Sequence, residues 1–167
     1  TMPMPGETRN GWLTLVATVD ANGQNPHVFN GFGGASHYWW RDDSSVLIYA
    51  DFAGRGKMRL CLAEDRTQRF EVLDPEFFAF DGHCSYSPDK NVILYDSYPD
   101  ADNYRKLMVY DLRSGTGELL ADVFSVPPAC EDIRCDLHPR WNHDGSIVSF
   151  DSTHEGHRSV YQMHVAD

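Results

Sequence analysis

One pattern occurs three times in this chain, and it narrows the choice of fold more than anything else in the sequence. A histidine is followed three residues later by an aromatic residue, six residues later by an aspartate, and then by an apolar run. The three histidines are His37, His83 and His138, spaced by 46 and 55 residues. A repeat of about 40 to 50 residues built from short strands is typical of proteins that stack equivalent sheets.

The apolar run in each copy is hydrophobic on both faces rather than alternating: Val46–Tyr49, Val92–Tyr95 and Ile147–Phe150. A strand of this kind has to be covered on both sides. Four-stranded sheets arranged radially around an axis meet that demand, because each sheet lies between two others. No window shows a helical apolar period with caps at both ends. We therefore predict an all-β fold of antiparallel β-propeller blades.

The repeats predict five segments: an N-terminal segment 1–11, a partial blade 12–30 with the last two strands, blades 31–74 and 75–124, and a blade 125–167 without its last strand. About three and a half blades are fewer than the roughly four to eight that close a propeller ring. We expect the chain to be the C-terminal portion of a larger propeller, or to complete a ring with other chains.

Charge and composition limit the possible partners. A net charge of -11 argues against a nucleic-acid partner, because phosphate binding requires a basic surface. The sequence has no pattern of a signal peptide or membrane span, so we expect no membrane partner and a soluble, cytoplasmic protein. The four cysteines form no CxxC pair, which argues against a zinc site made of thiolates. Free buried thiols are favoured over a disulfide between Cys130 and Cys135.

The shared register also assigns structural roles within each repeat. We expect the aromatic residues to lie in the core: Trp40, Tyr86 and Trp141. We expect the aspartates to cap turns: Asp43, Asp89 and Asp144.

The histidines are the best candidates for chemistry, because each begins the innermost strand of a blade near one mouth of the channel. Imidazoles that converge there favour a metal or catalytic site, with Asp136 as a nearby carboxylate. Histidines with one carboxylate suit Mn, Fe or Zn, whereas Ca or Mg prefer more oxygen ligands. The alternative is that each histidine forms a hydrogen bond with a neighbouring blade and only stabilises the repeat.

Two stretches of the sequence resemble a known family. They are D-G-H-C-S-Y-S-P-D, beginning at Asp81, and R-C-D-L-H-P-R-W-N-H-D-G-S-I-V-S-F-D-S-T-H-E-G, beginning at Arg134. Both are similar to the C-terminal blades of the oligogalacturonate lyase family, and the resemblance extends over about residues 12 to 165. It implies a seven-bladed propeller with a manganese ion at one mouth of the channel.

The resemblance implies roles for individual residues. His37 matches the catalytic base, and His83 matches the first metal ligand. The family pattern Q-x-x-H-x-H-P falls on residues 133–139, where only the final histidine, His138, is kept. Asp136 stands in place of the preceding histidine, and Ile133 stands in place of the glutamine.

The implied cofactor is a divalent metal held by His83, Asp136 and His138, with manganese preferred over zinc or iron. The implied substrate is an acidic oligosaccharide, whose carboxylates Arg134 or Arg140 would pair.

These residues favour a metal-dependent lyase that cleaves short uronate-containing oligosaccharides by β-elimination. The C5 proton of a uronate becomes acidic when its carboxylate is neutralised, which a metal ion can do as a Lewis acid, and His37 would remove that proton. Two alternatives remain open: a non-catalytic propeller module that binds a protein or glycan, and an accessory propeller of a hydrolase or peptidase.

Overall fold

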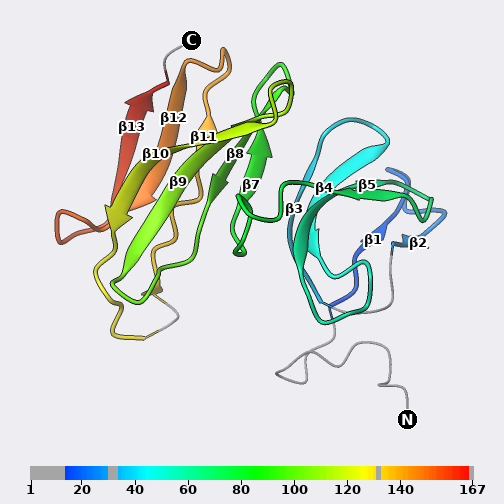
Figure 1. Ribbon diagram of the computed structural model, residues 1–167, viewed down its shortest axis with the longest axis horizontal. Helices are drawn as coiled ribbons and strands as arrows, with labels where there is room; N and C mark the ends of the chain where they lie inside the picture. The colour runs from blue at the N-terminus through cyan, green and yellow to red at the C-terminus, as the bar shows by residue number, and fades with distance from the viewer. Residues whose placement is uncertain (1–13, 30–33, 131–132, 166–167) are drawn as a thin grey trace. The chain divides into compact units, whose positions relative to one another are not determined.

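Strands form almost all of the regular structure in the computed structural model, which describes residues 14–29, 34–130 and 133–165 (Figure 1). In these ranges the strands make four antiparallel sheets of two, four, four and three strands. The predicted all-β fold of propeller blades is therefore confirmed. The expected segment 1–11 and both ends of the partial blade 12–30 lie outside the described residues. No described helix is long and apolar enough to cross a membrane.

The sheets follow one another along the chain. The first pairs β1 (Ala17–Thr18) with β2 (His27–Val28). The second has the order β3 (Ala35–Trp40), β4 (Ser45–Ala50), β5 (Arg59–Glu64) and β6 (Phe70–Val72). The third has the order β7 (Cys84–Tyr86), β8 (Val92–Asp96), β9 (Tyr104–Asp111) and β10 (Thr116–Phe124). The last has β11 (Arg140–Trp141), β12 (Ile147–Ser152) and β13 (Ser159–His164).

The chain divides into two compact units, unit 1 up to Asp81 and unit 2 from Gly82. The core of unit 1 contains residues from β4 and β5 together with Phe29. In unit 2 a single core joins the last two sheets: Leu94, Leu107, Val123, Leu137, Val148 and Phe150. β4 and β8 are the second strands of their repeats, and both are almost wholly buried, as expected for strands that are apolar on both faces.

The turns after the first strand of each repeat are closed by aspartates. Asp89 accepts the N–H of Asn91, and Asp144 accepts the N–H of Ser146, so both predicted caps are confirmed. The prediction for Asp43 is wrong, because Asp42 accepts the N–H of Ser44.

The reason is the length of the first turn. Trp40 pairs with Val46, whereas Tyr86 pairs with Ile93 and Trp141 with Val148. The first turn is therefore one residue shorter than the other two. The aspartate that accepts the N–H two residues later consequently lies one position earlier in this repeat.

The aromatic positions also differ between repeats. Tyr86 is buried, and the half-buried Trp141 packs against the core of unit 2. The prediction for Trp40 is wrong, because 42% of this residue is exposed at the end of the edge strand β3, beside exposed Tyr38 and Trp39.

All four cysteines are free, as predicted, and three of them are buried. Cys130 is exposed.

Candidate metal centre

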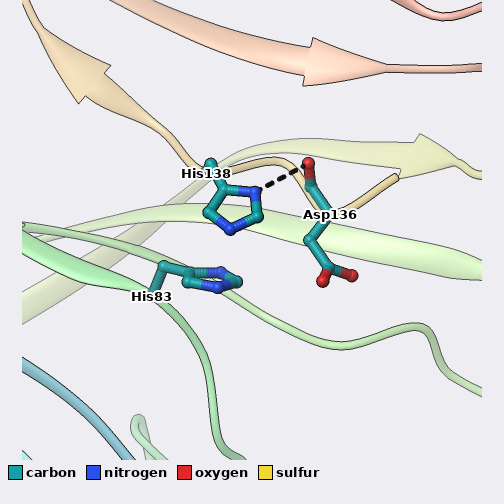
Figure 2. Close-up of side chains that lie close together, drawn as sticks. All are labelled: His83, Asp136 and His138. Atoms are coloured by element: carbon teal, nitrogen blue, oxygen red, sulfur yellow. Dashed lines mark hydrogen bonds between the residues drawn. The ribbon is translucent and has the colours of Figure 1, made fainter. Parts of the chain in front are cut away.

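His83 and His138 lie next to each other at the beginning of two neighbouring sheets of unit 2. His83 immediately precedes β7, and His138 lies two residues before β11. Their ring centroids are 3.8 Å apart, with the ring planes at 38°. One potential ligand atom from each histidine and one from Asp136 all lie within 4.8 Å of one another (Figure 2). The structure thus brings together the three residues expected to bind a metal.

The loop before β11 has an unusual backbone at the cluster. His138 has a φ of 42°, in the left-handed region that residues other than glycine seldom adopt. Its N–H donates to Oδ2 of Asp96 at 3.0 Å, and the neighbouring carbonyl of Leu137 accepts the N–H of Asp151 at 2.8 Å. These two hydrogen bonds hold the loop against β8 and β12.

Hydrogen bonds define which nitrogen of each ring carries the proton. Nδ1 of His83 lies 3.1 and 3.0 Å from the two carboxylate oxygens of Asp96. Nδ1 of His138 lies 3.3 Å from the backbone carbonyl oxygen of Asp136, as the dashed line in Figure 2 shows. Both oxygens of Asp96 also accept backbone N–H groups, and a backbone carbonyl only accepts, so Nδ1 is assigned as the donor in both rings and Nε2 carries the lone pair when the ring is neutral.

Asp136 is a buried carboxylate between two arginines. Nε of Arg134 lies 2.9 Å from Oδ1 and its Nη2 lies 3.0 Å from Oδ2, while Nη1 of Arg105 forms an ion pair with Oδ1 at 2.7 Å. Burial alone would raise the pKa of Asp136, but the hydrogen bond from Arg134 and the charges of Arg105 and Arg134 outweigh it. The pKa is lowered as a result, and the group is ionised at neutral pH.

Arg105 and Asp96 are two further members of the site, and neither is among the candidate site residues predicted from the sequence. Arg105 is 1% exposed, and among the described residues its Nε and Nη1 have no hydrogen-bond partner, so its contact with Asp136 is an ion pair only. The sequence feature that could have identified Arg105 is an arginine at the start of an apolar strand. Asp96 carries a sequence signal as well, because it and Asp151 follow the same apolar run in two repeats, each within an aromatic-Asp-Ser triplet.

Tyr98 adds an aromatic ring to the site. The guanidinium of Arg134 lies 4.8 Å from the centre of this ring, and the ring of His83 packs against it at 6.2 Å with its plane tilted by 63°. The loop between β8 and β9 therefore supplies one wall of the cluster.

The remaining predicted residues lie in other surroundings. His37 is in β3 of unit 1, where its Nδ1 lies 3.1 Å from Oδ1 of Asp81 and 3.0 Å from the hydroxyl of Ser36. Arg140 is at the start of β11, and its largely exposed side chain lies 3.8 Å from Asp151. Ile133, which stands where the resembling family has glutamine, is also exposed.

No family model and no curated protein matches the chain. Solved structures do: TolB from Acinetobacter baumannii has 17% identity and a TM-score of 0.71 over 92% of this chain and 35% of that one. An oligogalacturonate lyase from Vibrio parahaemolyticus has 19% identity and a TM-score of 0.67, over 89% and 41%. An oligogalacturonate lyase in complex with manganese has 18% identity and a TM-score of 0.71, over 90% and 41%.

These neighbours are β-propeller proteins, and at such identities the likeness establishes the shared fold. The chain spans between 35% and 41% of their length.

Proposed function

We propose that this chain carries the metal centre of a lyase that cleaves short uronate-containing oligosaccharides by β-elimination. The observation that carries the proposal is the cluster of His83, Asp136 and His138, whose potential ligand atoms lie within 4.8 Å of one another. Two imidazoles and one carboxylate form a donor set that suits manganese, zinc or iron. Manganese is the first choice, and a structural neighbour solved in complex with this metal supports it.

The donor chemistry fits a divalent cation. Nδ1 of each histidine is engaged as a donor, so both rings would coordinate through Nε2. Asp136 is ionised, and Arg134 donates to both of its carboxylate oxygens. Because a carboxylate oxygen accepts more than one contact, this carboxylate would still be able to bind a metal.

The chemistry divides between the metal and this chain's residues. When bound, the metal would neutralise the carboxylate of a uronate unit and so make its C5 proton acidic. His37 would take that proton on Nε2, while Asp81 holds Nδ1 and stabilises the charged ring. The C5–H electron pair then forms the double bond to C4, and the 4-linked sugar leaves with its bonding electrons. Arg134 or Arg140 would pair with the substrate carboxylates.

The complete channel would need further blades, either from a longer chain or from other chains. The proposal is supported by the share of the neighbouring propellers that this chain spans, at most 41% for the three structures above.

Metal content and activity test this function together. Untagged protein should contain a stoichiometric divalent metal by elemental analysis, and with oligogalacturonates it should produce unsaturated products that absorb in the ultraviolet. His83→Ala and His138→Ala should lose both metal and turnover. His37→Ala should keep the metal and lose roughly 10²- to 10⁴-fold in rate. His143→Ala, at an exposed turn position, serves as the matched control. Well-folded protein in a complete assembly without metal or turnover would refute the proposal.

One observation favours a second candidate, a non-catalytic propeller module. Arg105 and Arg134 already neutralise the negative charge of Asp136, so this carboxylate does not need a metal ion to be stable in the fold. If His83→Ala leaves metal content unchanged, the histidines have a structural role and this candidate takes precedence.

A further inference from the structure

The carboxylate of Asp96 contacts both histidines of the candidate metal centre. Asp96 is 1% exposed at the end of β8. Its Oδ1 accepts the backbone N–H of His83 at 2.6 Å, and its two oxygens lie 3.1 and 3.0 Å from Nδ1 of the same residue. Its Oδ2 also accepts the backbone N–H of His138 at 3.0 Å, although the two residues are 42 positions apart.

The equivalent aspartate of the next repeat is engaged differently. Asp151 occupies the same place in its own repeat, and its carboxylate pairs with Arg158 at 3.1 Å and Arg140 at 3.8 Å. The position itself therefore does not require a histidine partner. In the repeat of Asp96 the carboxylate instead binds the ring of His83 and the backbone N–H groups of His83 and His138, both of them candidate ligands.

These contacts have two consequences for geometry. The acceptor at Nδ1 holds His83 in the tautomer whose lone pair is on Nε2. The bond to the N–H of His138 holds that residue in its left-handed conformation, which would otherwise be unfavourable for a residue with a side chain. One buried carboxylate thus orients two side chains from different sheets.

We propose that Asp96 is a positioning residue, which sets the tautomer of His83 and the backbone of His138 so that both rings present Nε2 to the candidate metal centre. The part that concerns metal binding rests on the proposed function, whereas the tautomer of His83 can be tested without any metal. Residues that orient metal-binding histidines through the second ring nitrogen typically change metal affinity by about 10- to 100-fold when they are replaced.

The first experiment needs no substitution. Long-range ¹H–¹⁵N correlation spectra of the histidine rings, recorded on metal-free protein at a pH where the rings are neutral, should show the proton of His83 on Nδ1. A proton on Nε2 of His83 would overturn the proposal, whatever the metal content of the protein.

The second experiment compares Asp96→Asn with Asp151→Asn. Asparagine keeps the size of the side chain but removes the charge and one acceptor oxygen, so Asp96→Asn should shift His83 toward the Nε2–H tautomer and weaken Mn²⁺ binding by about 10- to 100-fold in calorimetry. Asp151→Asn should leave the tautomer of His83 unchanged. Circular dichroism of each variant checks that it is folded.

The outcomes separate the two proposals. If the original protein fails to bind Mn²⁺ although His83 carries its proton on Nδ1, the proposed function fails, and the orienting role of Asp96 stands. If the original protein binds Mn²⁺ and Asp96→Asn binds it equally well, the positioning role in metal binding is overturned. If Asp96→Asn does not fold, the ring spectra of the original protein still decide the tautomer.

Discussion

Asp136 is the residue at which the charges of the site are balanced. Its carboxylate forms ion pairs with the half-buried Arg134 and the buried Arg105, and it lies beside His83 and His138. A buried guanidinium without its carboxylate would be strongly unfavourable. Asp136 is therefore needed for stability whether or not a metal binds.

This balance predicts an acid-sensitive stability. The pKa of Asp136 in the folded protein is lowered from 3.8, so its stabilising contribution is present above that value and is lost as the pH falls through the lower folded pKa. Asp136→Asn should destabilise the protein at neutral pH by about 3 to 5 kcal/mol, because Arg105 loses its partner. The variant should also show a shallower loss of stability below about pH 4. Urea unfolding at several pH values measures both effects, and parallel pH curves for the two proteins would contradict the assignment.

The cysteines permit a second prediction at this scale. Burial raises the pKa of Cys61 to about 12, and burial also raises the pKa of Cys135. These thiols stay protonated and unreactive, and Cys84 is buried as well. In native protein a thiol reagent such as Ellman's should therefore label Cys130 rapidly and the other three only on unfolding. Cys130→Ser should abolish the fast reaction, and rapid labelling of two or more thiols would contradict the burial of the others.

At the scale of elements, the entry into β7 depends on a close approach between two chain segments. A Cβ atom on Gly82 would lie 1.8 Å from the carbonyl oxygen of Asp96 and 3.0 Å from its Oδ1. Only glycine lets the chain pass close enough to β8 for the N–H of His83 to reach that carboxylate. The close contact between the segment before β7 and the end of β8 therefore fixes the position of His83.

Gly82→Ala should therefore displace the first strand of its repeat. We expect a loss of stability well above that of Gly23→Ala, where a Cβ atom meets nothing within 4 Å and only the backbone conformation is strained. Gly23→Ala should cost roughly 1 to 2 kcal/mol, because alanine is unfavourable in the left-handed region. Thermal unfolding compares the two variants, and the ring resonances of His83 should move only in Gly82→Ala. Equal destabilisation by the two changes would contradict a steric role for Gly82.

At the scale of the whole molecule, all members of the candidate metal centre belong to unit 2. Asp96 comes from the third sheet, and Asp136 and His138 come from the loop that enters the fourth. Unit 2 has a core of its own that joins these two sheets. A ligand at the cluster should therefore act on the stability of this unit.

Metal binding should protect unit 2 in hydrogen exchange. At a concentration of 100 times the dissociation constant, Mn²⁺ should add about 2.7 kcal/mol to the free energy of unfolding. Added protection should be greatest in the peptides around residues 82–98 and 133–138. His138→Ala should show no added protection, and a uniform change along the whole chain would contradict binding at the cluster.

The strand pattern was largely readable from the sequence, because apolar runs between turn residues are a local property. The apolar runs Val46–Tyr49, Val92–Tyr95 and Ile147–Phe150 lie within β4, β8 and β12. The failures were equally local: a turn shortened by one residue moved the cap from Asp43 to Asp42, and an edge strand left Trp40 exposed.

For the site, the repeat register and the family resemblance together selected His83, Asp136 and His138, which the fold brings together. Asp96 and Arg105 became members only through tertiary structure. A buried charge is stable where a partner neutralises it or donates to it. Arg105 pairs with Asp136, and Asp96 accepts the N–H of His138, so each has a partner in the next repeat of the chain. Periodicity within one repeat identifies what a strand buries, whereas packing between sheets decides which polar groups meet.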